Sequence, residues 1–532
     1  MIAEDLRPNP ELRGTGPIAE WYKGQSIFIT GATGFMGKVL LEKLLFQCNG
    51  IKNIYILARS KRGKTPHERL QDMWKLPVFE RLRKHEPDAL KKIVPLIGDC
   101  LTDNLGLTED DRNLIRENVS IVFHCAATLK LEAKLKDAIE HNTAGTEKVL
   151  QLAKEIKNLK AFVHLSTAFC SADLPEFKEK VYRTAENPGE IIQVAKWIKD
   201  DALEVATPLT IHPHPNTYTY TKRLAETLVA DEYPHLPVVI ARPSIVTPAV
   251  MEPVPGWVDS LNGPMGIMIA AGKGVIRSML VKSDSRGQVV PVDIAINALI
   301  VIAWKIGSAK ERPPEIPVYN MTTDPVIKIT WGEVLTMGKK IAYECPFEGQ
   351  IWYPDGDLRL SKFVHQLCCF FFHWIPAYLI DFLMLILGQK RFMVRLMRRI
   401  DDGLQLLQFF TTRDWSFESK NFFALTTDIT PVERKLYSMD FEIIPIYEYL
   451  TVCVLGARQY IMKEDLSTIP RCRRIQFVLY LVDRSFKLAF YLGLIWILYC
   501  CSESVQNIFD CVGTVLQRFP FLGFFIPNNK SL

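Results

Sequence analysis

The stretch SIFITGATGFMGKVLLEKLLFQ, residues 26–47, decides the fold of this 532-residue chain. Residues 26–30 form an apolar run that predicts a buried strand, and residues 38–47 carry apolar side chains at helical spacing. Three glycines lie between them in the spacing G-x-x-G-x-x-G. Glycines in a strand-to-helix turn let the backbone approach a pyrophosphate, which the helix N-terminus then binds. The candidate cofactor contacts of this turn are Thr30, Gly31, Gly34, Phe35 and Gly37.

Short apolar runs and helical stretches alternate through the residues that follow. Runs of this length, bounded by turn signals, are typical of strands that are buried on both faces of a parallel sheet. We therefore predict an α/β fold with a Rossmann-type, doubly wound parallel sheet. The predicted strands after the first are residues 54–58, 93–98, 121–124, 161–165 and 238–241.

Composition narrows the class of protein. Hydrophobic residues make up 48% and charged residues 23% of the chain, which excludes disorder along its whole length. The net charge of +5 is too balanced to indicate a nucleic-acid partner, so we expect none. No Cys/His spacing resembles a zinc site, and we expect no metal. A mean hydropathy of +0.06 suggests a soluble body with a membrane-seeking segment.

The end of the second predicted strand bears on the choice of cofactor. An NAD site places an acid there for the ribose 2′-hydroxyl, whereas an NADP site places a cation for the 2′-phosphate. The sequence has Arg59, Lys61 and Arg62 at this point and no acid, which favours NADPH; a solvated basic loop is the alternative. Asp99 after the third strand and Ala126 after the fourth are further candidate contacts, although either residue fits simple packing equally well.

A tyrosine and a lysine four residues apart form the candidate catalytic pair. Tyr218 and Lys222 fall on one face if this segment is a helix. A tyrosine titrates near pH 10, and a neighbouring cation stabilises its phenolate and lowers that pKa. The hydroxyls of Ser166 and Thr167 follow the strand at 161–165 and can hold a carbonyl oxygen beside the tyrosine.

These features together resemble the extended short-chain dehydrogenases and, more specifically, the fatty acyl-CoA reductases. The resemblance extends over about residues 20–460. The family places a reductase domain before a helical C-terminal domain, which implies residues 25–350 and 351–465 here, after a lead-in of residues 1–24 and before a hydrophobic tail at 466–532. The strings that carry the resemblance are TGATGFMGKVLLEKLL from residue 30, HCAATLK from 124, HLSTAF from 164, NTYTYTK from 216 and ARPSIV from 241.

The resemblance also implies a role for individual residues. Tyr218 matches the proton donor, and Lys222 matches the residue that binds the nicotinamide ribose and lowers the tyrosine pKa. Thr167 matches the hydroxyl that fixes the substrate oxygen, with Ser166 as the alternative. Asn142 matches an asparagine that supports the lysine, and Pro243 follows the strand that flanks the nicotinamide.

The implied reaction is the reduction of a long-chain acyl-CoA to a primary alcohol by two NADPH, with release of CoA. Three alternatives remain open. The chain could stop at the aldehyde, or it could be another extended reductase such as a hydroxysteroid dehydrogenase or a sugar-nucleotide epimerase. It could also be a membrane-bound acyl-lipid-binding protein with an idle nucleotide fold. The oligomeric state is left open.

Three apolar regions follow residue 350, and the third, residues 512–527, contains Arg518 and Pro520. Residues 363–388 are interrupted by His365, His373, Pro376 and Asp381, so we expect a buried or acyl-binding helix and no plain span. A basic run comes next, at Lys390, Arg391, Arg395, Arg398 and Arg399, which suits CoA phosphates, anionic lipid or a solvated helix face.

Residues 475–501 form the second apolar region, which we expect to attach the chain to membrane lipid. Asp483, Arg484 and Lys487 make a full span costly, so an interfacial or buried helix is the alternative. Basic residues at 471, 473 and 474 favour a cytosolic catalytic domain. The last three residues are Lys-Ser-Leu rather than Ser-Lys-Leu, so the endoplasmic reticulum is favoured over the peroxisome.

Overall fold

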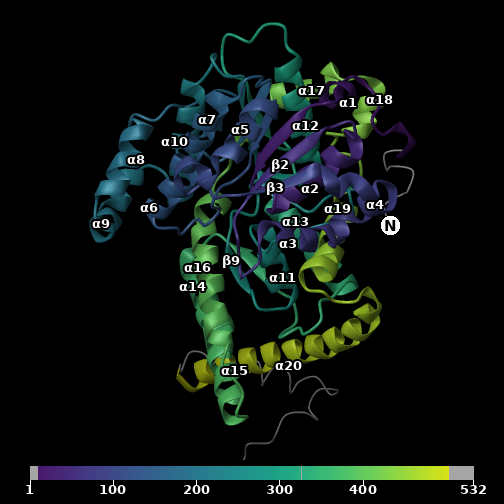
Figure 1. Ribbon diagram of the computed structural model, residues 1–532. Helices are drawn as coiled ribbons and strands as arrows, with labels where there is room; N and C mark the ends of the chain where they lie inside the picture. Colours follow the sequence, from purple (N-terminus) through teal and green to yellow (C-terminus); the bar gives the residue numbers. More distant parts are fainter. Residues whose placement is uncertain (1–9, 325, 502–532) are drawn as a thin grey trace, which may run out of the picture.

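The computed structural model describes residues 10–324 and 326–501 (Figure 1). The predictions for the first nine residues of the lead-in, for the apolar stretch 512–527 and for the last three residues lie outside this range. The backbone of α20 is described to Cys501, whereas the side chains of Leu498 and Cys501 are not.

A seven-stranded sheet forms the centre of the molecule, with all neighbouring strands parallel. The strand order β11-β7-β5-β4-β1-β2-β3 reverses direction beside β1, which makes the sheet doubly wound and confirms the predicted fold class. The strands are β1 (Ser26–Thr30), β2 (Asn53–Ala58), β3 (Ile93–Ile97), β4 (Ile121–His124), β5 (Ala161–Leu165), β7 (Val238–Pro243) and β11 (Val318–Met321).

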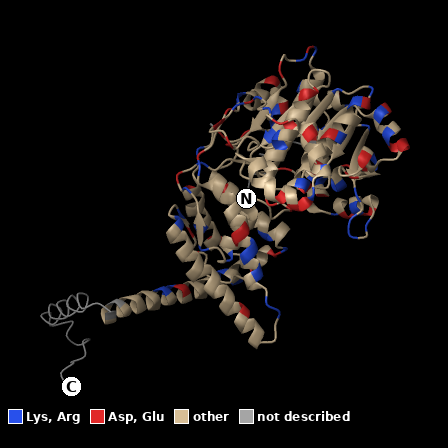
Figure 2. Cartoon of the chain, turned by 90° about the vertical axis from the view of Figure 1, so that its left-hand side faces the viewer, with Lys and Arg blue, Asp and Glu red and all other residues tan. Residues whose placement is uncertain are grey.

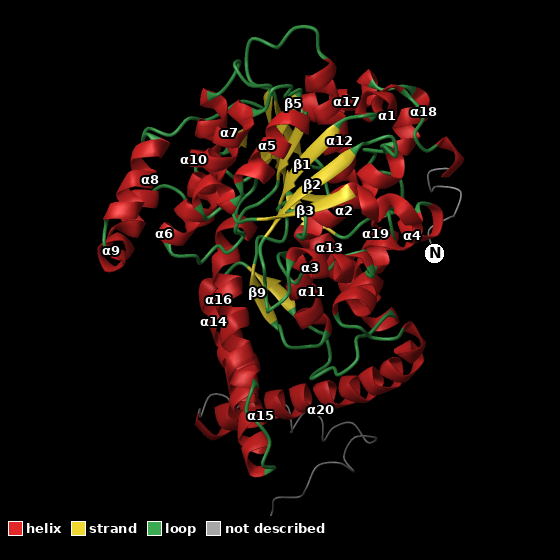
Figure 3. Cartoon of the chain, viewed as in Figure 1, coloured by secondary structure: helices red, strands yellow, loops and turns green. Residues whose placement is uncertain are grey.

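Helices cover both faces of this sheet because alternate strand residues point to opposite sides (Figure 3). Ile27 and Ile29 of β1 join one core, whereas Phe28 between them joins the other. The first core receives α1 (Pro17–Tyr22), α2 (Phe35–Gln47) and α12 (Val292–Ser308), and the second receives α5 (Glu109–Asn118), α7 (Gly145–Glu155) and α10 (Thr217–Asp231).

Smaller elements surround this central unit. The helices α8 and α9 project at one side, and the remaining short strands form two-stranded parallel pairs. They are α3 (Pro66–Trp74), α4 (Glu80–His85), α6 (Leu135–Ala138), α8 (Pro188–Trp197), α9 (Asp200–Ile211), α11 (Pro264–Gly272), β6 (Glu176–Phe177), β8 (Ile245–Thr247), β9 (Ser278–Leu280) and β10 (Val289–Pro291).

Beyond residue 330 the chain is mainly helical, as predicted, but it does not form a separate body. Phe422 and Leu436, from α17 and α18, belong to the same core as α2 and α12. The Glu433 carboxylate accepts a hydrogen bond from the Ile18 backbone at 2.8 Å. The elements are α13 (Trp331–Glu344), β12 (Asp357–Arg359), α14 (Lys362–Cys369), α15 (Ile375–Ile386), α16 (Met393–Thr411), β13 (Ser416–Phe417), α17 (Lys420–Asp428), α18 (Pro431–Leu436), α19 (Ile446–Gly456) and α20 (Ile469–Cys501).

The expectation of a buried or acyl-binding helix at residues 363–388 is wrong. By length and composition, Lys362–Ile386 is apolar enough to cross a membrane, yet most of its apolar side chains are exposed. Its buried side chains include the polar His365, His373 and Asp381, which hydrogen-bond to Ser278, to the Arg277 amide and to the amides at the start of α16. Figure 2 shows the resulting arms, α15 and α20, projecting from one end of the molecule.

Candidate active site

The glycine turn after β1 is shaped to admit a ligand close to the backbone. Gly31 has φ of 74°, a left-handed conformation that favours glycine. A Cβ on Gly37 would lie 2.3 Å from the Gly31 carbonyl oxygen, so only glycine permits this approach of helix to turn. Gly34 then caps α2, whose N-terminal amides face the turn. The predicted Gly31, Gly34, Phe35 and Gly37 all line one cavity, which fits a pyrophosphate.

Thr30 supports the turn from a buried position outside the cavity. Its hydroxyl accepts a hydrogen bond from the Ala126 amide at 3.3 Å and lies 2.7 Å from His124 Nδ1. It is fully buried and does not line the cavity. Thr30 therefore acts by fixing Ala126, which does line the cavity.

Only part of the basic cluster after β2 lines the cavity. Arg59 and Lys61 line the cavity, and Arg59 forms an ion pair with Asp99, another predicted contact, at 3.1 Å. Arg62 is exposed and does not line the cavity. In its place stands Arg69 of α3, which donates hydrogen bonds to the Arg59 carbonyl and to Thr33 Oγ1. No sequence signal singled out Arg69.

Tyr218 and Thr167 meet beside this turn. Tyr218 lies in the first turn of α10, where the Asn216 side chain caps the helix by accepting from the Thr219 amide at 2.9 Å. Thr167 follows β5, and its hydroxyl is hydrogen-bonded to the tyrosine. Burial raises the pKa of Tyr218 above its ordinary value, and the Thr167 hydrogen bond only partly opposes this rise. The phenol is therefore protonated at neutral pH.

Lys222 lies one turn further along α10, and its ammonium points to β5. Its Nζ donates to the Leu165 carbonyl at 2.8 Å and lies 3.4 Å from His164 Nε2. Burial lowers the pKa of Lys222 to about 8, although the Glu226 carboxylate opposes this shift. The expected lowering of the tyrosine pKa by Lys222 is not seen: the pKa of Tyr218 is raised, because burial outweighs every favourable interaction.

Asn142 lies in a π-helical turn, Ile139–Ala144, a distortion that is frequent at functional sites. Its Oδ1 accepts from the Thr128 amide at 2.8 Å, and its Nδ2 donates to Thr221 Oγ1 at 3.0 Å. It thus joins the loop after β4 to the residue before Lys222. Asn142 does not line the cavity, and its contacts make it a positioning residue.

Two buried histidines stand on neighbouring strands behind the lysine. The His124 and His164 rings lie 5.4 Å apart, and His124 Nε2 lies 3.0 Å from Thr146 Oγ1. Burial and the Lys222 charge lower the pKa of His124 to about 3 and that of His164 well below its ordinary value. Both rings are neutral at physiological pH, so neither adds a positive charge beside the Lys222 ammonium. Sequence reasoning missed this pair, and the signal that could have found it is a histidine within each of two apolar strand segments.

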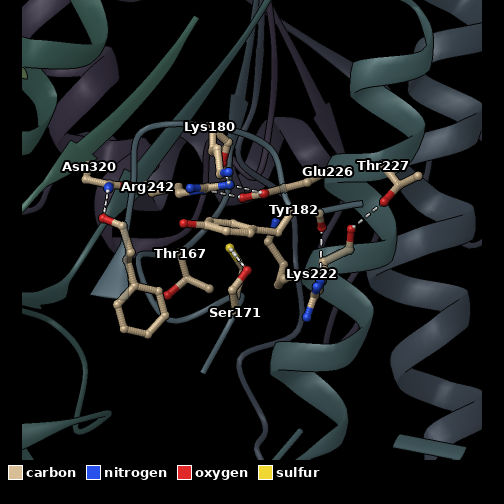
Figure 4. A network of polar contacts seen from close by, with 12 residues as sticks. Thr167, Ser171, Lys180, Tyr182, Lys222, Glu226, Thr227, Arg242 and Asn320 are labelled. Carbon is tan, nitrogen blue, oxygen red and sulfur yellow. Dashed lines mark hydrogen bonds and ion pairs between the residues drawn. The ribbon is translucent and has the colours of Figure 1, made fainter. Parts of the chain in front are cut away.

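A buried ion pair supports the catalytic helix from the other side (Figure 4). Arg242 of β7 donates to both carboxylate oxygens of Glu226, at 2.8 and 2.6 Å, and both side chains are fully buried. Arg242 also donates to the carbonyls of Lys178 and Lys180. The pair joins α10 to β7, the strand that ends at the cavity residue Pro243. Sequence reasoning missed it, although Glu226 lies four residues after Lys222.

One cavity of about 900 Å³ joins all these parts. It runs from the glycine turn past Ser166, Thr167, Tyr218 and Lys222 into the C-terminal half, where its walls are mainly apolar. Its volume is at the upper end of the usual range for ligand sites, roughly 300–1,000 Å³. The apolar walls of the far end include Met279, Val281, Leu335, Leu358, Leu407, Phe410 and Trp415.

Comparison with sequence families gives matches over both halves of the chain. Two family models, each described as male sterility protein, match residues 29–299 and 372–464. Fatty acyl-CoA reductase 1 of Xenopus laevis is 34% identical over 509 residues, 96% of this chain and 98% of the relative. Fatty acyl-CoA reductase wat of Drosophila melanogaster is 35% identical over 460 residues, 86% of this chain and 88% of the relative. Fatty acyl-CoA reductase 1 of Homo sapiens is 34% identical over 503 residues, 94% and 97% of the two chains.

Solved structures share the fold at low sequence identity. The terminal R domain of the myxalamid PKS-NRPS pathway has a TM-score of 0.51 at 19% identity, over 87% of this chain and 97% of its own. The reductase (R) domain of a nonribosomal peptide synthetase from Mycobacterium tuberculosis has a TM-score of 0.52 at 14% identity, over 87% and 99%. These likenesses support the fold over 87% of this chain.

Proposed function

The chain belongs to the fatty acyl-CoA reductase family, and from this premise we propose that it reduces long-chain acyl-CoA to primary alcohol with NADPH. It is an oxidoreductase that uses a nicotinamide cofactor and an acyl-CoA substrate. The observation that carries the finer proposal is the single cavity, which joins the glycine turn, the Tyr218–Thr167 pair and an apolar far end. A cofactor, a reacting carbonyl and an acyl chain need these three environments in that order.

The choice of NADPH rests on cations in the cavity wall. Arg59, Lys61 and Arg69 surround the end of β2, where the 2′-phosphate of an adenine ribose would be held. Asp99 neutralises only part of this charge through its pair with Arg59. When bound, the reduced nicotinamide supplies a hydride to a carbonyl carbon.

In the first reduction, Tyr218 and Thr167 hold the thioester carbonyl oxygen. Their hydroxyls donate to this oxygen as negative charge develops on it, and such preorganised donors are usually the largest contribution to catalysis. The protonated Tyr218 transfers its proton to the oxygen, which gives a hemithioacetal. Collapse of the hemithioacetal returns its hydroxyl proton to the Tyr218 phenolate and breaks the carbon–sulfur bond, so that the aldehyde forms and CoA leaves as a thiolate, which takes a proton from solvent.

In the second reduction, the aldehyde remains in the cavity and its oxygen takes the place of the thioester oxygen. Tyr218 again gives its proton, and a primary alcohol forms. The balance is one acyl-CoA, two NADPH and two protons to one alcohol, one CoA and two NADP⁺. Lys222 lies one helical turn from Tyr218 and lines the same cavity, where its ammonium would bind the nicotinamide ribose.

The apolar far end of the cavity favours this function over its alternatives. A hydroxysteroid dehydrogenase or an epimerase explains the nucleotide half but not the apolar walls supplied by α13 and α16. Arg286 and Lys339 also line this cavity and are candidates for the CoA phosphates. The basic run that begins at Lys390 does not line it, which weakens the CoA assignment made from sequence.

Product analysis tests the proposal. The full chain, supplied with hexadecanoyl-CoA and NADPH, is expected to give hexadecanol and to consume two NADPH per CoA released; one NADPH per CoA would assign the aldehyde-forming reaction. Tyr218→Phe is expected to abolish turnover while NADPH still binds. Tyr220→Phe, on the same helix but with its hydroxyl outside the cavity, is the matched control and is expected to remain active. Equal activity of the two variants would remove Tyr218 from its role.

We further propose that the C-terminal region attaches the chain to a membrane, with the catalytic part in the cytosol. The endoplasmic reticulum is our first assignment and the peroxisome the alternative. Localisation of the tagged full chain by fluorescence microscopy against markers of both organelles decides between them. Both the substrate and the product are lipids, which is the functional reason to keep the enzyme at a membrane.

A further inference from the structure

Two apolar helical segments at one end of the molecule expose most of their apolar side chains and bury polar ones. In the first, Lys362–Ile386, the buried positions recur every four residues and belong to His365, Cys369, His373, Ala377 and Asp381, three of which are polar or charged. The apolar side chains point away from the protein, which is the reverse of a helix packed on a core. The exposed ones are Phe363, Val364, Leu367, Phe370, Phe371, Ile375, Tyr378, Leu379, Phe382, Leu383, Leu385, Ile386 and Leu387.

The buried polar groups of this segment are all satisfied by the protein. His373 Nε2 accepts from the Arg277 amide at 2.7 Å, and His365 Nδ1 lies 2.8 Å from Ser278 Oγ. The Asp381 carboxylate accepts from three successive backbone amides at the start of α16, at 2.8 to 3.0 Å. The segment is therefore held firmly in a position that presents its apolar face to the outside.

The helix α20 repeats the pattern. Gln476 and Asp483 are buried, and Gln476 donates to the Ala342 carbonyl at 3.0 Å. Asp483 accepts from Arg277 Nη2 at 3.0 Å and from Trp352 Nε1 at 2.6 Å. The exposed apolar residues include Ile475, Phe477, Val478, Leu481, Val482, Phe486, Leu488, Tyr491, Leu492, Ile495 and Trp496.

The two segments form one continuous surface, which we call the apolar shelf and define by these two sets of exposed residues. They meet where the Phe490 ring of α20 lies 6.3 Å from the rings of Phe371 and Phe372. Figures 1 and 2 show both helices at the same end of the molecule, away from the sheet. An exposed apolar surface of this extent indicates a partner that is not water.

We propose that the part of the apolar shelf formed by α14 and α15 inserts into a single leaflet of a membrane that carries anionic lipids. Five basic residues on α16 and the turn before it are exposed, and none has an ion-pair partner within residues 10–324 and 326–501. They lie beside the tip of α15, where headgroup phosphates would meet them. They are Lys390, Arg391, Arg395, Arg398 and Arg399.

Geometry limits the insertion to one leaflet. The chain turns back after α15, and α16 packs against it, so both ends of this hairpin lie on the protein side. The segment Lys362–Ile386 is long enough to cross a membrane, but its first part is fixed to the protein by His365 and His373. The 12 residues of α15 beyond that part extend about 18 Å, whereas a hydrocarbon core is about 30 Å thick. Lys390 and Arg391 at the tip would be costly at the bilayer centre but can reach the headgroups from a shallow position.

The same hairpin connects the membrane to the cavity. The helix α16 begins beside the shelf at Met393, and at its other end Leu407 and Phe410 line the apolar part of the cavity. An acyl chain that leaves the leaflet along α16 would reach the apolar walls without crossing open water. This inference rests on the proposed membrane attachment but not on the proposed reaction, which can be assayed in detergent.

A depth measurement on the full chain tests the inference. A fluorescent amino acid replaces Leu387 at the tip or, as the control, Leu209 of α9, which is 85% exposed and lies far from the shelf (Figure 1). The probe lipids are phosphatidylcholine vesicles with and without phosphatidylserine. We expect nitroxide-labelled lipid to quench the probe at 387 but not the probe at 209, and a quencher trapped in the vesicle lumen to quench neither.

Matched charge and apolar variants complete the test. Leu383→Glu with Ile386→Glu should lower partitioning about tenfold, and Val205→Glu with Leu209→Glu should leave it unchanged. Arg395→Gln should lower the phosphatidylserine-dependent part of binding about fivefold. All variants should keep acyl-CoA reduction in detergent, because their side chains do not line the cavity; loss of reduction in wild type and variants alike would count against the proposed function only.

Three outcomes would overturn the inference. The first is a probe at 387 that lipid does not quench, and the second is quenching of that probe from the lumen, which would indicate a span. The third is a dimer in solution that the Leu383→Glu and Ile386→Glu changes dissociate while vesicle binding stays unchanged. That last result would assign the shelf to a second copy of this chain.

Discussion

The charge of Lys222 should set the alkaline limit of the enzyme. Burial lowers the pKa of this ammonium to about 8, well below that of an exposed lysine. Lys222 is then about nine-tenths charged at pH 7 and about one-tenth charged at pH 9. If the cation is needed beside Tyr218, activity should fall about tenfold over these two pH units.

The assay is kcat/KM for NADPH between about pH 6.5 and pH 9.5, because this ratio reports ionisations of the free enzyme. Lys222→Arg is the informative variant, since a guanidinium keeps its charge throughout this range. Its activity should be lower overall, because Arg cannot reproduce the 2.8 Å contact to the Leu165 carbonyl with the same geometry. The decrease in kcat/KM at alkaline pH, however, should disappear in Lys222→Arg. Cofactor affinity measured by fluorescence over the same range gives a readout independent of turnover.

Two results would refute this reasoning. A wild-type profile that stays level to about pH 9.5 would mean that the Lys222 charge is not required or that its pKa is not lowered. A falling limb that Lys222→Arg retains unchanged would assign the ionisation to another group. Tyr218 is not a candidate for that group, because burial raises its pKa above the ordinary value of a tyrosine.

Three further predictions address the cofactor, the acyl chain and stability. Arg69→Ala should weaken NADPH about tenfold or more and leave NADH nearly unchanged in calorimetry, whereas Arg62→Ala, outside the cavity, should affect neither; equal losses for both cofactors would contradict a 2′-phosphate site. Leu335→Trp should reduce turnover of long acyl chains more than of short ones in a chain-length series; a uniform loss would place the acyl chain elsewhere. The pKa of His124 is about 3 in the folded chain against about 6.5 unfolded, so only the unfolded state gains this proton as pH falls. Stability should decrease by about 2 kcal/mol between pH 7 and pH 5 from this residue alone, and His124→Gln should remove that share in urea unfolding.

Sequence predicted the parallel sheet well because buried parallel strands are recognisable from local composition. The predicted strands at 26–30, 121–124 and 161–165 coincide with β1, β4 and β5. The strand β11 (Val318–Met321) was missed because Tyr319 and Asn320 interrupt its apolar run. Asn320 is nevertheless fully buried, since its amide donates to the carbonyls of Phe177 and Glu418, contacts that only the tertiary structure supplies.

The candidate site was predictable where function depends on residues in one local motif. The glycine turn and the Tyr218–Lys222 spacing belong to single short segments, and the structure brings them to one cavity. Arg69 and the acyl-binding walls come from elements far apart in the chain, with no pattern that links them. Arg62 lies outside the cavity for a related reason: neighbours in sequence on a turn, such as Lys61 and Arg62, point in different directions.

The clearest departures from ordinary patterning coincide with the two functional regions of this chain. A histidine inside a buried parallel strand is costly, yet β4 and β5 each carry one, and both lie behind Lys222. A helix with His and Asp inside and Phe and Leu outside is equally unfavourable in water, yet α14 and α15 are built this way. Hydrogen bonds satisfy the buried polar groups of residues 362–386 and both ring nitrogens of His124, whereas His164 Nδ1 has no hydrogen-bond partner within residues 10–324 and 326–501. Each arrangement therefore suits its own setting: beside a catalytic ammonium in one case, and against an apolar medium in the other. The sequence positions that resist a simple core-and-surface pattern are therefore the positions where mutations should change function before they change fold.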